Sequence, residues 1–537
     1  MFRKRGSNLS AHLIYIGCSL AASASDFKYY ISNFIKNFKN RNSIRGYLDF
    51  NANFFKNFKT NNTDGVILVD CFPVLDWVIV NSLFLNILAH KNNLEIISYG
   101  LRQRDEITTS IYKSFNCKRH LRVRLTRELR LKRHHLFVSI KTSIKSKEDL
   151  FNLRVEGIWI GIDVYESILR SGVPTVDLEK RLTWRILFYA LTYFVYFQVA
   201  FHLEKIKAVA LSHDNYIGMG LIARIAYEKK VPVYLANSFG ILRTTNSHQI
   251  YGVFKNYKNI FDRLPKSEKE EAIAWSKSIL SRRIIGEVGV EMSYQTKSAH
   301  HQNLIERQLS IGPQFKVIVA THCFYDSPHG YGGMIFPDFY DWLRFLGKLS
   351  IETEYEWYLK PHRDYLPGTL EVLLSIAQEF PKFKIINPEV SWSQLKVEGA
   401  ETVLTCYGSL GHELPISGWK VINAAYNPHI SYDFNWHARD IGHYEELIRS
   451  IELLGQIKDV EKIYEFFYVH KKLMHQENYF FKEPNYFSSK SFNEIFNIDH
   501  SDKILDSLHP ILKNASKNIT TYIESENIST NKYRNFY

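Results

Sequence analysis

The clearest indication of the fold is Glu401-Thr-Val-Leu-Thr-Cys-Tyr-Gly-Ser-Leu-Gly-His-Glu-Leu-Pro-Ile-Ser-Gly-Trp-Lys-Val-Ile-Asn-Ala-Ala-Tyr426. It begins with an apolar, β-branched run from Thr402 to Cys406 and ends with a second apolar run from Lys420 to Ala425. Between the two runs lie a Gly408-Ser409 turn and a short helical segment that carries Glu413. This succession of strand, turn, helix and strand is the repeating unit of a parallel sheet.

The turn in this stretch has the chemistry of a nucleotide site. Glycine lets a backbone come close to a ligand, and the amides that begin the next helix face an anion above the strand end. Glu413 follows about one helical turn later, where a carboxylate can accept hydrogen bonds from a ribose diol. The same pattern also fits an ordinary connection of a parallel sheet with a surface glutamate, and both interpretations stay open at this point.

The rest of the chain repeats this alternation in two series. In the first series, strands are predicted at 65–71, 94–99, 208–213 and 231–236, and helices at 77–90, 178–205 and 217–229. In the second series, strands are predicted at 315–322, 355–360, 384–387 and 402–406, and helices at 339–350, 367–380 and 443–454. Alternation of this kind is typical of an α/β fold with doubly wound parallel sheets.

A chain of 537 residues is too long for one ordinary hydrophobic core, so several domains are expected. We predict an N-terminal helical preamble (1–60), a first α/β domain (61–254), a polar helical connection (255–312), a second α/β domain (313–485) and a polar tail (486–537). Ligands of such sheets bind at the carboxyl ends of the strands. The working cleft is therefore expected between the two α/β domains.

Composition narrows the classes of protein. Hydrophobic residues make up 45% and charged residues 23%, as in a globular chain. The five cysteines contain no Cys-x-x-Cys pair, which argues against a disulfide framework or a zinc site and favours a reducing cytoplasm. The chain has no phosphate-binding P-loop and no early Gly-x-Gly-x-x-Gly after a strand. It also has no Asp-x-Asp pair, so we expect no metal and no bound cofactor.

Positive charge is concentrated in one segment. The net charge is +13, and Lys118 to His135 is rich in arginine and lysine, with Leu121, Leu125 and Leu129 at helical spacing. An amphipathic basic helix suits an anionic membrane surface or a polyanionic acceptor, although a solvated surface helix has the same pattern. No nucleic-acid motif accompanies the charge. No apolar run reaches the roughly 18 residues of a membrane span.

Three loops that follow predicted strands of the second domain carry the candidate nucleotide-binding residues. These residues are His322, Ser327 and His329 in the first loop, Lys360, His362 and Arg363 in the second, and Gly408, Ser409 and Glu413 in the third. Glycine and serine backbones can meet a phosphate, and lysine and arginine can neutralise a departing diphosphate. Each loop alone is equally a polar turn, and the convergence of the three indicates a site.

The first domain supplies the candidate catalytic group. Ser212-His-Asp-Asn-Tyr-Ile-Gly-Met-Gly220 follows a predicted strand and begins a helix. His213 or Asp214 could act as a general base on an acceptor hydroxyl. Asp214 or Asn215 would also fill an ordinary helix N-cap. Asp163, Tyr165, Glu166 and Arg170 form a second polar group in this domain, either facing the acceptor or simply beginning a helix.

Several of these segments resemble a known family. Thr321-His-Cys-Phe-Tyr-Asp-Ser-Pro-His-Gly330, Lys360-Pro-His362 and Tyr407-Gly-Ser-Leu-Gly-His-Glu413 look like bacterial capsule and surface-polysaccharide glycosyltransferases of the GT-B type. Segments 158–170 and 210–216 resemble the first domain of the same family, so the resemblance covers roughly 65–455. The family usually reads Lys-Pro-His-Pro, whereas Arg363 replaces the last proline here and adds a charge.

The resemblance implies two Rossmann-like domains that face each other across a cleft. It implies a nucleotide-activated sugar held mainly by the second domain, with Lys360, His362, Ser409 and Glu413 in the donor site. The sugar would pass to a glycan or lipid-linked acceptor, in the cytoplasm or at the inner face of the membrane. A CDP-activated polyol-phosphate transferase and a non-catalytic polysaccharide-assembly protein are the alternatives.

Overall fold

The structure is a computed structural model, and its described residues form two compact units. Described are residues 14, 45–60, 63–72, 75–100, 106–237, 240–244, 254–288, 290, 298–301, 303–330, 333–363, 365, 367–455 and 459–473. Of these, unit 1 contains residues up to 167 and 177–247, and unit 2 contains 168–176 and the residues from 248 onward. Most of the predicted preamble before residue 45 and the predicted tail 486–537 lie outside the described residues.

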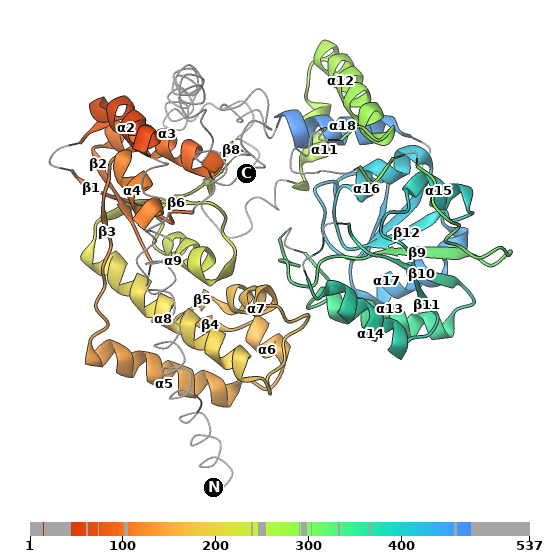
Figure 1. The fold of residues 1–537 in the computed structure, drawn as a ribbon, viewed down its shortest axis with the longest axis horizontal. Coiled ribbons are helices and arrows are strands. Elements are labelled where there is room, and N and C mark those ends of the chain that lie inside the picture. Colours follow the sequence, from red (N-terminus) through yellow and green to blue (C-terminus); the bar gives the residue numbers. More distant parts are fainter. Residues whose placement is uncertain are drawn as a thin grey trace, which may run out of the picture. The chain divides into compact units, whose positions relative to one another are not determined.

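Unit 1 is built on a six-stranded sheet in the order β3-β2-β1-β6-β7-β8 (Figure 1). Its strands are β1 (Gly65–Val69), β2 (Leu94–Ser98), β3 (Cys117–His120), β6 (Ile206–Leu211), β7 (Val233–Asn237) and β8 (Gly240–Thr244). All neighbours pair in parallel except β8, which runs antiparallel to β7. Because the chain extends the sheet first on one side of β1 and then on the other, the topological switch point lies between β1 and β6.

Helices and one short hairpin complete unit 1. The elements are α2 (Arg45–Phe54), α3 (Leu75–Asn92), α4 (Glu106–Ser114), α5 (Arg127–Ser143), α6 (Lys147–Phe151), the hairpin β4 (Arg154–Val155) and β5 (Ile158–Trp159), α7 (Gly161–Arg170), α8 (Arg181–Leu203), a π-helical turn η2 (Tyr216–Gly220) and α9 (Leu221–Glu228). Tyr47 and Phe55 are buried in the same hydrophobic cluster as the strand residues Ile67 and Val69. The end of the predicted preamble is therefore part of this core.

Unit 2 has a six-stranded sheet with an equivalent strand order, β11-β10-β9-β12-β13-β14. Its strands are β9 (Lys316–Ala320), β10 (Glu356–Lys360), β11 (Phe383–Ile385), β12 (Thr402–Thr405), β13 (Lys420–Asn423) and β14 (Trp436–His437). All neighbouring pairs are parallel. The switch point of this sheet lies between β9 and β12, so it involves the stretch around Gly408.

The helices of unit 2 lie on the sheet and at one end of the unit. They are α11 (Tyr257–Asp262), α12 (Lys266–Ile284), α13 (Phe339–Glu352), α14 (Thr369–Glu379), α15 (Trp392–Val397), α16 (Leu410–Glu413), α17 (Ile441–Arg449) and α18 (Glu461–Tyr468). Helix α12 packs on α18, where Trp275 stacks on Phe467 with 5.8 Å between ring centroids. The polar segment expected as a connection thus supplies a helix with an aromatic contact inside unit 2.

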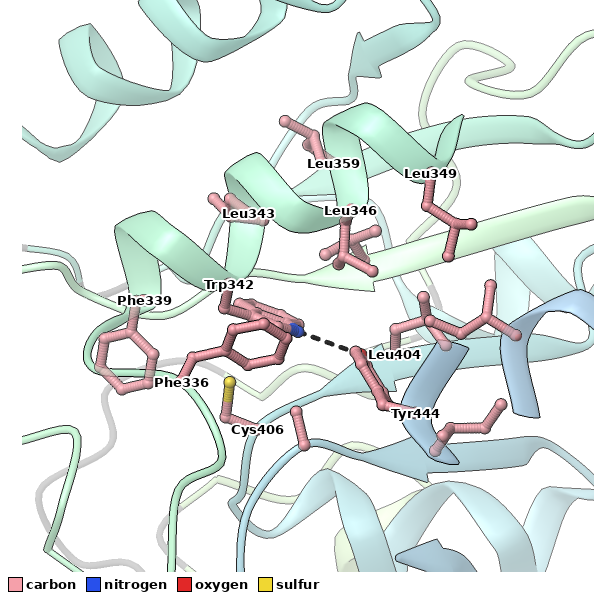
Figure 2. Close-up of a cluster of buried hydrophobic side chains, with 14 of the residues drawn as sticks. Phe336, Phe339, Trp342, Leu343, Leu346, Leu349, Leu359, Leu404, Cys406 and Tyr444 are labelled. Carbon is pink, nitrogen blue, oxygen red and sulfur yellow. Dashed lines mark hydrogen bonds between the residues drawn. The ribbon is translucent and has the colours of Figure 1, made fainter. Parts of the chain in front are cut away.

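The core of unit 2 holds α13 on the sheet, as Figure 2 shows. Side chains of α13 at helical spacing, among them Trp342, Leu343 and Leu346, are buried against strand residues such as Leu404. The indole Nε1 of Trp342 donates a 3.0 Å hydrogen bond to the hydroxyl of Tyr444 on α17. A buried tryptophan needs such a partner for its N–H, so this bond fixes the two helices on the same part of the core.

Every strand predicted in the two series is confirmed, and the α/β fold with parallel sheets is therefore correct. The edge strands β8 and β14 were not predicted, because they are short or lack a clear apolar alternation. The facing arrangement of the two domains across a cleft stays a prediction.

The predicted basic helix beginning near Lys118 is wrong in its first part. Cys117–His120 is strand β3, and α5 begins only at Arg127, where the hydroxyl of Thr126 accepts a hydrogen bond from the amide of Leu129. Leu121 and Leu125 thus precede the helix and do not share its face with Leu129. The N-cap at Thr126 was not predicted, because leucines at helical spacing occur on both sides of it.

Helix α5 packs against α8 partly through its own cations (Figure 1). The guanidinium of Arg133 donates to Thr192 at 2.9 Å and lies 4.2 Å from the ring centroid of Phe188, and the ammonium of Lys141 lies 3.9 Å from that of Trp184. Arg133 and Lys141, two cations of the basic segment, thus contact side chains of α8 within unit 1. Among the described helices, α8 is long and apolar enough to cross a membrane, but 56% of its most apolar window is buried in the unit.

Gly347 provides a test of the core packing of unit 2. A Cβ atom on Gly347 would lie 2.4 Å from the ring of Phe380, so Gly347→Ala must displace buried groups. We expect a loss of about 1–3 kcal/mol in the free energy of unfolding, measured by urea denaturation. Gly442→Ala is the matched control, because a Cβ atom there meets only Asp440 at 3.4 Å and alanine favours the helix. Equal stability of the two variants would contradict this packing.

Candidate functional site

The carboxyl ends of β1 and β6, at the switch point of unit 1, carry two non-glycine residues in the left-handed region. Cys71, directly after Asp70, has φ +51°, and Tyr216 has φ +64°. Such backbone conformations cost energy and cluster at functional sites. Tyr216 also begins the π-helical turn η2, a second irregularity that is frequent at such sites.

Asp70 bridges the two strands that separate at this switch point. Its side chain is buried, and one carboxylate oxygen accepts hydrogen bonds from the amide of Ser212 at 2.9 Å and from the hydroxyl of Ser212 at 2.6 Å. The other oxygen accepts from the amide of Phe72 at 3.3 Å. The loop after β1 and the loop after β6 are therefore joined by charge-assisted hydrogen bonds.

This bridge determines how His213 is protonated. The hydroxyl of Ser212 has one hydrogen, and the carboxylate of Asp70 is its strongest acceptor. Nδ1 of His213, which lies 3.0 Å from the same hydroxyl oxygen, must then be the donor of that hydrogen bond. In the neutral ring the proton is on Nδ1, so Nε2 has the lone pair and the chemistry of a base.

Aromatic side chains surround the ring of His213. Phe72 and Trp77 stack on each other with 4.8 Å between centroids, and both meet the His213 ring edge-on at 5.6 and 6.1 Å. Tyr216 lies on it in the same way at 5.8 Å. Half-buried rings of this kind provide apolar faces beside a polar group, an arrangement that suits a sugar.

Asp163, from the second predicted polar group, lies next to the η2 turn. Asp163 is buried and pairs with Arg224 of α9 at 2.7 Å. Burial raises the pKa of Asp163 to about 7, against the opposing charge of Arg224, and burial also raises the pKa of Asp214. A Cβ atom on Gly220 would lie 2.0 Å from a carboxylate oxygen of Asp163, so only glycine lets the turn approach this pair. Asp163 thus supports the loop that carries His213 and Asp214.

In unit 2, His322 has the position that corresponds to the Asp70 bridge. Its Nε2 accepts the amide N–H of Cys406 at 3.2 Å and lies 3.1 Å from the hydroxyl of Thr405. Because an amide only donates, the ring proton is on Nδ1. Desolvation and the charge of His362 lower the pKa of His322 to about 3, so the ring is neutral. It stacks on Phe339 at 4.6 Å and thereby connects the switch point to the core in Figure 2.

The Gly408-Ser409 turn is held by an asparagine that sequence reasoning missed. Asn427 is fully buried, accepts the amide of Gly408 at 3.1 Å and donates to the carbonyl of Cys406 at 3.2 Å. Gly408 has φ +123°, where a side chain would be strained. The amide of Gly408 is therefore occupied. In the described part of the chain, the amides of Ser409 and Leu410 have no partner and can meet an anion.

Glu413 already has two strong partners. Its carboxylate is 1% exposed and accepts hydrogen bonds from Arg283 at 2.5 Å and from His300 at 2.9 Å. Burial alone would raise the pKa of Glu413, but Arg283 and His300 hold it well below the usual value. A ribose hydroxyl would have to share these oxygens with the two donors. The predicted contact of Glu413 with a nucleotide stays a prediction.

Lys360 and Arg363 are both tied to backbone carbonyls. The ammonium of Lys360 donates to Pro388 at 2.9 Å, and Arg363 donates to Pro388 and Glu389 at 3.4 and 3.0 Å. Burial, helped by the charge of Arg363, lowers the pKa of Lys360 to about 7. The charged form of Lys360 is thus disfavoured in the folded chain. His362, in the same loop, is exposed.

The first predicted loop lies against the third. The hydroxyl of Tyr407 donates to the carbonyl of Ser327 at 2.8 Å, and both Ser327 and His329 are buried. Because β10, β9 and β12 are neighbours, the three predicted loops follow adjacent strand ends, as the sequence predicted. Their role in binding stays a prediction. Within the described residues, no group of three histidine, cysteine or acidic side chains is placed to hold a metal ion.

Four residues that hold the candidate site residues in place were not predicted from the sequence. They are Asp70, Arg224, Arg283 and Asn427. Asp70 had a usable signal, since it lies at the carboxyl end of a predicted strand, as His213 does. Arg283 and Asn427 had no such signal in the sequence. Arg283 is 130 residues away from its partner Glu413, and Asn427 lies in a loop without a recognisable motif.

Comparison with known proteins leaves the family open. No family model matches the chain, and no curated protein matches it. The solved structures similar to this chain include three at 10–12% identity. KpsC, the beta Kdo 2,4 transferase of Thermosulfurimonas dismutans, is 12% identical with a TM-score of 0.29, over 49% of this chain and 79% of that chain.

The other two structures are a S. aureus MnaA-UDP co-structure and the UDP-GlcNAc 2-epimerase of Neisseria meningitidis bound to UDP-GlcNAc. The first is 10% identical with a TM-score of 0.21, over 82% of this chain and 97% of that chain. The second is 11% identical with a TM-score of 0.24, over 77% and 98%. All these TM-scores are below 0.5, so neither the activity nor the substrate of this chain follows from them.

The lowered pKa of Lys360 gives a pH test of its burial. The unfolded chain holds this proton up to about pH 10.4 and the folded chain only to about pH 7. Between these values the unfolded state binds more protons, so stability rises with pH. We expect Lys360→Met to exceed the wild type in stability by a margin that is largest near pH 7, on the order of 4 kcal/mol, and that shrinks toward pH 10.

Urea denaturation of the two proteins at three pH values between 7 and 10 measures this difference. Lys348→Met, at an exposed position of α13, is the control and should keep a constant difference from the wild type. A pH-independent difference for Lys360→Met would contradict a buried lysine with a lowered pKa.

Proposed function

We propose that this chain is a metal-independent glycosyltransferase that moves a sugar from a nucleotide-activated donor to a hydroxyl of a growing surface polysaccharide or lipid-linked glycan. The observation that carries the proposal is the hydrogen-bonded series Asp70–Ser212–His213 at the switch point of unit 1. It fixes the proton on Nδ1 of His213 and leaves Nε2 as the proton acceptor. The resemblance of the strand-end loops to the GT-B family supports the same activity.

The proposed step is a direct displacement. Nε2 of His213 takes the proton of the acceptor hydroxyl as its oxygen attacks the anomeric carbon of the donor sugar. The bond from that carbon to the nucleotide phosphate oxygen breaks, and its electron pair stays on the phosphate. His213 is the proposed catalytic residue. Asp70 and Ser212 are positioning residues, because they act only through the ring of His213.

Unit 2 is the proposed donor side. The unpartnered amides of Ser409 and Leu410 at the start of α16 can receive phosphate oxygens. Lys360 would gain a proton when a phosphate comes close, since a nearby anion favours its charged form. Binding of a nucleotide at this edge is then expected to take up protons at pH 8. The enzyme would act in the cytoplasm, at the inner face of the membrane.

The test begins with the unknown donor. A thermal-shift screen of the full chain against CMP, CDP, UDP, GDP and dTDP identifies the nucleotide, because a ligand of the native state raises its melting temperature. Nucleotide release from the matching sugar donors is then measured with a glycan acceptor. Analysis of the product distinguishes a glycosidic bond from the phosphodiester that a polyol-phosphate transferase would form.

Variants of the proposed base decide the mechanism. His213→Ala should lower kcat by about 10²–10⁴-fold and leave the nucleotide-induced thermal shift unchanged. Ser212→Ala should also lower kcat and shift the pH profile, whereas Ser212→Thr, which keeps the hydroxyl, should restore much of the rate. Asp214→Asn tests the other candidate base. Full activity of His213→Ala, or no nucleotide that binds, would contradict the proposal.

A further inference from the structure

A cavity of about 230 Å³ lies in unit 1, and its lining includes Cys71, the residue after Asp70. It is formed where β1, β2 and β3 end, by Cys71, Ser98 and His120, and it is completed by residues of α4 and β3. These strands are on the side of β1 away from β6. The residues assigned to the proposed chemistry do not line this cavity.

The cavity is lined by cations and, among its described lining residues, by no acid. Lys113, Lys118, Arg119 and Arg122 all contribute to its wall. Arg119 is neutralised from outside the cavity by two glutamates, Glu95 at 3.2 Å and Glu204 at 2.7 Å. Among the described residues, the other three cations, Lys113, Lys118 and Arg122, have no such carboxylate partner.

Lys113 and Arg122 have no hydrogen bond or carboxylate partner in the described part of the chain. Lys118 donates only to the backbone carbonyl of Thr60, at 3.0 Å, which leaves its charge without an opposite charge. Three cations around one small concave surface repel each other and attract an anion. All three side chains are exposed, so water solvates their charges when no anion is bound.

Two polar side chains of the wall, His120 and Ser98, are fixed by hydrogen bonds. Nε2 of His120 lies 3.1 Å from the carbonyl of Gly100 and must donate to it, and Nδ1 lies 3.0 Å from the hydroxyl of Ser98. The ring is thereby held in one orientation. The cationic side chains thus surround a wall that is already ordered, as in a preformed ligand site.

The cavity is connected to the proposed base through one residue. The hydroxyl of Tyr112, which lines the cavity, donates to the carbonyl of Phe72 at 3.3 Å. The ring of Phe72 in turn lies 5.6 Å from the ring of His213. Phe72 thus contacts both Tyr112 of the cavity wall and the ring of His213.

We infer that this cavity binds an anionic group, a phosphate or a carboxylate, of the acceptor, and so places the acceptor hydroxyl at His213. The inference rests on the proposed function and adds the class of its acceptor, an acidic or phosphorylated glycan. The volume fits one charged sugar residue or phosphate rather than a whole oligosaccharide. The cations recognise the charge, and the rings around His213 receive the sugar beside it.

The experiment measures binding of small probes to the full chain by saturation-transfer NMR. Glucose 6-phosphate, glucuronate and neutral glucose are compared for the wild type and for the double variant Lys113→Gln/Arg122→Gln. The control is Lys180→Gln/Arg181→Gln, which removes the same two charges from exposed positions outside the cavity. Equal melting temperatures of the two double variants exclude a loss of folding.

We expect at least one anionic probe to bind, glucose not to bind, and the cavity variant alone to weaken binding by about tenfold or more, with a marked decrease at high salt. Preference for glucose 6-phosphate indicates a phosphorylated acceptor, and preference for glucuronate an acidic sugar. Binding of glucose as tight as that of both anions, an equal loss in the control, or no anion binding at all would overturn the inference.

Two further results separate this inference from the proposed function. His213→Ala should keep its affinity for the anionic probe. Anion binding that depends on Lys113 and Arg122, in a chain that transfers no sugar from any nucleotide donor, would support the cavity and contradict the transferase. Transfer with an unchanged KM for the acceptor in the cavity variant would support the transferase and overturn the role of the cavity.

Discussion

In each unit, a side chain that follows one central strand accepts a hydrogen bond from the backbone amide that follows the other central strand. In unit 1 the carboxylate of Asp70 accepts the amide of Ser212, the first residue after β6. In unit 2 the ring of His322 accepts the amide of Cys406, the first residue after β12. A parallel sheet of this order separates at its switch point, and the ligand site forms there. Both bridges hold the loops of that site at a fixed distance.

The side chain that bridges the strands is a carboxylate in unit 1 and a neutral imidazole ring in unit 2. The two bridges therefore affect the groups next to them differently. The carboxylate of Asp70 accepts a hydrogen bond from the hydroxyl of Ser212. His213 therefore donates to that hydroxyl from Nδ1 and keeps a basic Nε2. The ring of His322 instead stacks on Phe339, and desolvation lowers its pKa to about 3, so it is neutral. In the proposed function, unit 1 supplies the proton acceptor at its switch point, and unit 2 supplies amides for an anion.

The alternation of strands and helices was predictable from the sequence, and so was the adjacency of the three loops after β9, β10 and β12. The partners of the predicted site residues were not. Asp70 meets Ser212 across 142 residues and Arg283 meets Glu413 across 130. Local patterns do not contain such pairings, which arise only when the sheet and its helices are assembled. The basic segment was misjudged for the same reason, since the pairing of β3 with β2 overrode its helical pattern.

The central claim is that Asp70 and Ser212 fix the proton of His213 on Nδ1. The most direct measurement is ¹⁵N NMR of the histidine rings in the full chain at pH 8, with the His213 signals assigned by their loss in His213→Ala. The account predicts a protonated Nδ1 and an unprotonated Nε2 in the wild type, and a mixture of tautomers in Ser212→Ala. A wild-type ring with its proton on Nε2 would contradict the account.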